Sequence, residues 1–170
     1  MKVFAGDSRI ERLPLPARLV YTFFIVFMII GFVSSLFLYQ DGIGWRGDQV
    51  STWYRGDDAQ MAFPKSFRQM METFHFHLFT VPVCYLIVAH LFMLGSMGRR
   101  WKLFWICAGF ASTLFHLFAP WVAWKWPSPA GWVMPATGAF FLVSWVVMLS
   151  GPLWDMWAGS FGKQAEEQEG

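Results

Sequence analysis

The sequence predicts an all-α integral membrane protein, a bundle of four transmembrane helices. Composition is the first reason: hydrophobic residues make up 56% of the 170 residues and charged residues only 14%, whereas soluble chains carry about 25% charged residues. With 19 Phe and 11 Trp in a chain of this length, a single small core cannot hide the apolar surface, so much of it is expected to face lipid. The formal charge of +2 is too small to indicate nucleic acid as a partner.

The second reason is the spacing of long apolar runs, because a helix of about 20 residues crosses a bilayer. Four runs qualify, at residues 19–39, 70–96, 101–122 and 132–154, in a single membrane domain 1–170 with one sizeable loop at 40–69. A hinge at Gly98-Arg99-Arg100 is expected to join the second and third spans. The linker Trp126-Pro127-Ser128-Pro129 is expected to join the third and fourth. Tryptophans cluster at the predicted span ends, as in the aromatic belts of membrane proteins.

Positive charges near the span ends predict the orientation. They lie before the first span and between the second and third: Lys2, Arg9, Arg12, Arg18, Arg99, Arg100 and Lys102. Both termini are therefore expected in the cytoplasm and residues 40–69 in the periplasm, in a multi-pass protein of the bacterial inner membrane. The charged, proline-containing first 18 residues are not expected to be a cleaved signal peptide.

All four histidines fall within predicted spans, with His75, His77 and His90 in the second and His116 in the third. Ionisable residues inside a bilayer are costly and rare, which makes each a candidate functional residue. Because imidazole ligates haem iron, all four are candidate axial ligands of one or two haems b. No CxxCH motif is present, so covalent c-type attachment is excluded.

Helix geometry limits how these ligands can pair. His75 and His90 lie about 22 Å apart along a helix axis and about 60° apart around it. Folding the second and third spans together places His116 opposite residues 79–84, with His77 nearest. We therefore expect one haem on the periplasmic side, held by His116 with His77 or His75. A second haem at His90 needs a further ligand: Met93, Met97, a partner subunit or an open coordination position.

Other interpretations of these residues remain open. The motif Glu72-x-x-His75 is half of a carboxylate-bridged di-iron site, which needs two copies. His75 and His77 with Met70, Met71 and His116 are candidate copper ligands, since imidazole and thioether suit that metal. Gly109 and Ser112 lie on the face of His116, where small residues admit either a flat macrocycle or a neighbouring helix. Cys84 and Cys107 are expected to be buried, unreactive thiols.

The segment Phe74-His75-Phe76-His77, together with His90 and His116, resembles the compact membrane-anchor cytochrome b subunits of bacterial respiratory oxidoreductases, such as those of formate dehydrogenase and nitrate reductase. The resemblance implies that two histidines ligate haem b and that the protein also binds quinone. It implies electron transfer between the quinone pool and a periplasmic redox partner, a cytochrome or an iron–sulfur protein, within a complex of several subunits in lipid. Two alternative functions for this chain are that of a cofactor-free structural anchor and that of a copper-binding membrane protein.

Overall fold

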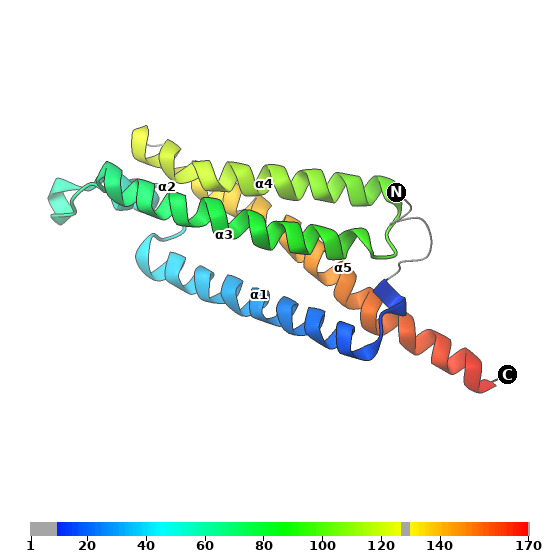
Figure 1. Cartoon of the computed structure of the whole chain (residues 1–170). Coiled ribbons are helices and arrows are strands. Elements are labelled where there is room, and N and C mark those ends of the chain that lie inside the picture. Colours follow the sequence, from blue (N-terminus) through cyan, green and yellow to red (C-terminus); the bar gives the residue numbers. More distant parts are fainter. Residues whose placement is uncertain (1–9, 127–129, 170) are drawn as a thin grey trace.

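The computed structural model describes residues 10–126 and 130–169, of which 159–169 by their backbone alone. Four long helices dominate it (Figure 1): α1 (Leu15–Gly42), α3 (Phe67–Met93), α4 (Arg99–Lys125) and α5 (Val133–Glu169). Four stretches are long and apolar enough to cross a membrane: Leu15–Gly42, Phe67–Met93, Arg99–Lys125 and Ala130–Ala158. The predicted four-helix membrane bundle is confirmed. The predicted linker residues 127–129 and the basic residues Lys2 and Arg9 lie outside the described part.

Helix ends differ from the predicted spans by a few residues. The second span was predicted to reach residue 96, but α3 ends at Met93, and a short connection leads to Gly98, the N-cap of α4. Arg99 and Arg100 therefore lie in the first turn of α4 and not in a hinge. Pro82, Pro120 and Pro152 lie inside helices, where neighbouring groups satisfy the backbone positions that proline leaves open.

The segment between α1 and α3 contains a helix that the sequence did not predict. In α2 (Gly47–Arg55), Val50 and Tyr54 lie one turn apart and are both buried, so this short helix packs one apolar face onto the bundle. The side chain of Gln49 accepts a hydrogen bond from the Arg46 N–H at 3.1 Å and thereby caps the helix start. Gly44, with φ +83°, makes the preceding turn.

The core lies between α3, α4 and α5. Trp145 of α5 is buried and donates its indole N–H to Thr113 of α4 at 3.2 Å. The Tyr85 hydroxyl of α3 donates to the Ile106 carbonyl of α4. The first bond fixes α5 relative to α4, and the second fixes α3 relative to α4.

Helix α1 packs at the edge of this core (Figure 1), which its Ile25 joins. Along its whole length Ile25 alone is buried. Its main ring contacts are those of Phe32 with Phe141 and Trp145 of α5, at centroid distances of 5.7 and 5.2 Å. Because α1 packs mainly on α5, the space between α1 and α3 stays open near α2.

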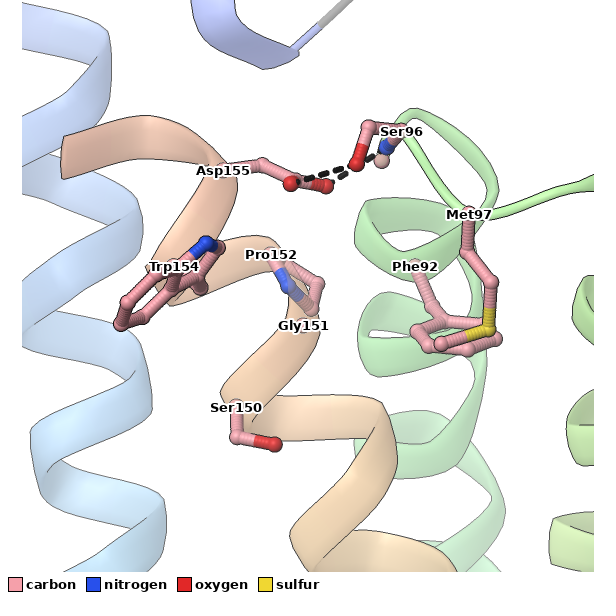
Figure 2. Close-up of a pocket in the computed structure, with 9 residues that line it drawn as sticks. Phe92, Ser96, Met97, Ser150, Gly151, Pro152, Trp154 and Asp155 are labelled. Atoms are coloured by element: carbon pink, nitrogen blue, oxygen red, sulfur yellow. Dashed lines mark hydrogen bonds between the residues drawn. The ribbon is translucent and has the colours of Figure 1, made fainter. Parts of the chain in front are cut away.

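At the opposite end of the bundle, called here the loop end, α5 is tied to the connection between α3 and α4 (Figure 2). The Asp155 carboxylate accepts the backbone N–H of Ser96 at 2.6 Å and its hydroxyl at 2.7 Å. Gly95 leaves room for this carboxylate, since a Cβ there would lie 2.7 Å from the Asp155 oxygen.

Candidate cofactor site

The α2 end of the bundle contains an open cavity of about 740 Å³. Its walls come from the last turns of α1, from α2, and from the neighbouring ends of α3, α4 and α5. Of the four predicted site histidines, His77 and His116 line this cavity, whereas His75 and His90 do not. We refer to it as the α2-end cavity.

His77 of α3 lines the α2-end cavity while its side chain remains exposed, and the backbone sets its tautomer. Its Nδ1 lies 2.8 Å from the Thr73 carbonyl oxygen. A carbonyl only accepts hydrogen bonds, so Nδ1 carries the proton and Nε2 keeps its lone pair. His77 therefore offers Nε2 as a ligand nitrogen.

His116 projects from α4 and is held against α5. Its ring stacks on Phe141, with centroids 5.1 Å apart and an interplanar angle of 23°. Its Nδ1 lies 3.4 Å from the Thr137 hydroxyl oxygen, and that hydroxyl donates its own proton to the Val133 carbonyl at 2.8 Å. Thr137 can therefore only accept from His116, which leaves Nε2 of this ring with the lone pair as well.

A glycine lets His116 lie flat against α5. A Cβ added at Gly138 would lie 3.4 Å from Cε1 of the His116 ring and 3.7 Å from Nδ1. Any branched side chain at position 138 would push the ring away from Phe141. The orientation of His116 is thus determined by three residues of α5.

The packing of α3 on α4 brings the two cavity histidines to the same level. Phe74 of α3 meets Phe118 of α4 at 5.3 Å, so the next turn of each helix presents His77 and His116. The sequence placed His116 opposite residues 79–84 and left His77 and His75 as alternative partners; in the structure only His77 shares its cavity.

His75 and His90 lie on the outer face of α3 and are exposed. His75 is about 200° around the helix from His77, and its ring contacts Phe79 at 4.9 Å. His90 Nδ1 lies 3.3 Å from the Leu86 carbonyl. Met97, one candidate second ligand for His90, lines the separate loop-end cavity of about 420 Å³, and His90 does not.

Polar groups surround the mouth of the α2-end cavity. The Tyr39 hydroxyl is buried, and among the described residues it has no hydrogen-bond partner. Lys65 holds its ammonium 3.9 Å over the Trp53 ring. Burial and the neighbouring Tyr39 raise the pKa of Tyr54, so this phenol remains a neutral hydrogen-bond donor at physiological pH.

The donor set and the size of the α2-end cavity fit a haem held by two histidines. Both His77 and His116 retain an Nε2 lone pair, and both have Nδ1 engaged by an oxygen, as ligating histidines usually do. The volume of about 740 Å³ falls within the range of roughly 300–1,000 Å³ found for cofactor and ligand sites. Lys65 and Tyr39 line the cavity as hydrogen-bond donors for carboxylates, alongside the carboxylates of Asp41 and Glu72.

The other predicted arrangements find less support. Within residues 10–126 and 130–158, no three His, Cys, Asp or Glu side chains gather as a metal site. Glu72 pairs with Arg68 at 2.8 Å. Gly109 and Ser112 are buried and do not line the α2-end cavity. Gly109 instead leaves room for Met148 of α5, so these small residues serve the packing of α4 on α5. Cys84 is half-buried as a free thiol, but Cys107 is exposed, so its predicted burial was wrong.

Comparison with known protein families decides the classification. A family described as a transmembrane helical domain matches residues 44–166. The chain belongs to this family. The match includes α2, α3 and α4 and all four histidines, whereas α1 and its Tyr39 precede it. Neither the curated proteins nor the solved structures contained a significant match.

Proposed function

We propose that this protein is a membrane-embedded electron-transfer subunit that binds haem b in the α2-end cavity, with His77 and His116 as axial ligands. The observation that carries the proposal is that these two imidazoles, from different helices, open into one cavity with both Nε2 atoms free. One-electron oxidation and reduction is the chemistry that haem supplies when bound. The protein residues supply ligation, orientation and an apolar setting.

The protein's own contribution begins with ring orientation. The Thr73 carbonyl and the Thr137 hydroxyl hold the Nδ1 protons, which raises the basicity of the ligating Nε2 atoms and fixes their direction. Phe141 keeps the His116 ring in one plane. Because these contacts hold both rings in one direction, the two side chains would rearrange little during electron transfer.

Around these ligands the protein supplies a mixed environment. Phe74, Leu117 and Trp121 form apolar walls, and a low-dielectric wall disfavours the charged oxidation state of a bound metal centre. Lys65 is fixed at the mouth by backbone bonds, because its N–H donates to the Tyr54 carbonyl at 3.0 Å and its carbonyl accepts from the Trp124 indole at 2.8 Å. Its ammonium is therefore well placed to bind a carboxylate.

The partners in this proposal are other subunits of a membrane complex, the quinone pool and a periplasmic cytochrome or iron–sulfur protein. In the bacterial inner membrane, Arg99, Arg100 and Lys102 of the loop end would face the cytoplasm, because positive residues remain on that side. The α2 end would then face the periplasm. There Met61 and Phe63 are 85% and 89% exposed, and such an apolar surface is typical of a contact site.

The direct test is a reduced-minus-oxidised absorption spectrum of the protein purified in mild detergent, with a pyridine haemochrome assay for stoichiometry. The proposal predicts a b-type spectrum with one haem per chain in the α2-end cavity. A helical, fully assembled sample without haem would refute it and would favour the structural anchor instead.

A further inference from the structure

The outer face of α3 combines polar and apolar side chains in a way that lipid alone does not accommodate. One stripe runs along the helix opposite the core, and all of its members are exposed; one of them, Glu72, also borders the α2-end cavity. At 100° per residue they lie within about 40° of one line. We call this set the α3 stripe: Arg68, Glu72, His75, Phe79, Leu86 and His90.

Two imidazoles in this stripe make lipid an unfavourable neighbour. His75 and His90 lie on a helix that crosses the membrane, and ionisable groups in such helices almost always face a protein interior or a water-filled cavity. Neither residue lines the α2-end cavity or the loop-end cavity. A protein surface is therefore expected to cover the α3 stripe.

We infer that the α3 stripe is the contact surface of a symmetric dimer, in which it packs against the α3 stripe of a second copy of this chain. Every copy of a membrane protein inserts in the same direction, so a two-fold axis along the membrane normal runs nearly parallel to α3. A two-fold interface uses the same patch on both copies. In this arrangement His75 faces His75 of the second copy, and His90 faces its own counterpart about 22 Å further along the helix.

The chemistry of the α3 stripe is self-complementary, which is why a second copy fits it. A neutral imidazole has one donor and one acceptor, so two facing His75 rings can share an N–H···N hydrogen bond, whereas the N–H of His90 is directed to its own Leu86 carbonyl at 3.3 Å. Arg68 and Glu72 pair within one chain through a single guanidinium nitrogen at 2.8 Å, and their side chains remain 87% and 62% exposed. The remaining guanidinium N–H groups can bind Glu72 of the second copy, and Phe79 and Leu86 fill the space between the polar layers.

Oxidative cysteine cross-linking in native membranes tests this dimer, and the chain supplies a matched control. Tyr85 bonds to the Ile106 carbonyl, so Leu86 on α3 and the exposed Cys107 on α4 lie at a similar depth. In the variant Cys84→Ser/Cys107→Ser/Leu86→Cys, we expect copper phenanthroline to produce a covalent homodimer. The control Cys84→Ser, which keeps Cys107, should give no covalent dimer, because Cys107 lies outside the α3 stripe. No homodimer from Leu86→Cys, or equal cross-linking of both variants, would overturn the inference.

The pair of His75 rings has its own test. Interhelical hydrogen bonds in membranes average about 0.6 kcal/mol, roughly a factor of three each, so His75→Leu should raise the dimer dissociation constant about threefold in detergent. An unchanged dissociation constant would refute the pairing of the His75 rings. This inference is independent of the haem proposal, because the haem spectrum of the same variant reports on His77 and His116 alone.

Discussion

Removal of the Asp155 carboxylate is expected to loosen the loop end of the bundle. In the structure this carboxylate accepts two hydrogen bonds from Ser96, at 2.6 and 2.7 Å, and so links α5 to the connection between α3 and α4 (Figure 2). A hydrogen bond to a charged group contributes about 1.5–3 kcal/mol. Since Ser96 is exposed and water can replace part of each bond, the lower value applies. Asp155→Ala should therefore cost about 3 kcal/mol of unfolding free energy for two bonds at about 1.5 kcal/mol each.

A double-mutant cycle separates the two hydrogen bonds. Ser96→Ala removes the bond from the hydroxyl and keeps the one from the backbone N–H, so it should cost about 1.5 kcal/mol. In the Asp155→Ala background the same change should cost close to nothing, because its partner is already absent. The assay is reversible unfolding in mixed micelles of dodecyl maltoside and SDS, followed by circular dichroism. An Asp155→Ala variant as stable as the wild type, or strictly additive effects in the cycle, would refute this interpretation.

Three further predictions follow from the packing of α5, α4 and α2. Thr137→Val removes the acceptor of the His116 Nδ1 proton and should weaken haem binding about tenfold; a haem titration measures it, with Thr80→Val, whose hydroxyl bonds only its own helix, as the control. Gly109→Ala should cost about 1–2 kcal/mol in micelle unfolding, because its Cβ would lie 2.6 Å from the Met148 sulfur; Gly31→Ala, which meets nothing within 4 Å, should not destabilise. Val50→Ala should release α2 from the bundle, seen as faster hydrogen exchange of the α2 amides with α3 and α4 unchanged.

The four-helix membrane fold was predictable because composition and the length of apolar runs determine it. A bilayer requires about 20 apolar residues per helix, and the chain has four such runs. Helix ends were less predictable, since they depend on local caps. Ser66, for example, accepts the Gln69 N–H and begins α3 three residues before the predicted span.

The short helix α2 was hidden by its composition. Residues 40–69 contain several glycines and balanced charges, which predict turns. The spacing of Val50 and Tyr54, one helical turn apart, was the available indication of a buried face. A segment of 9 residues is too short for such a pattern to stand out, and its stability comes from packing on the bundle.

The choice between His75 and His77 could not be made from spacing alone. It depends on how α3 packs on α4, and that register is set by particular contacts such as Phe74 with Phe118. The separation of α1 from α3 near α2, which leaves the α2-end cavity open, also arises from tertiary packing. No local sequence pattern indicates it. The sequence marked His116 as a candidate ligand, because an isolated histidine in a membrane span is conspicuous, and the structure places it in the wall of the α2-end cavity.

The most direct test of the central proposal compares four single variants of the purified protein: His77→Ala, His116→Ala, His75→Ala and His90→Ala. Haem content per helical, folded chain is measured by pyridine haemochrome. If His77 and His116 are the axial ligands, the first two variants lose the b-type spectrum while the last two keep the wild-type amount of haem. Loss of haem in His75→Ala or His90→Ala with retention in His77→Ala would contradict the assignment and move the site to the outer face of α3.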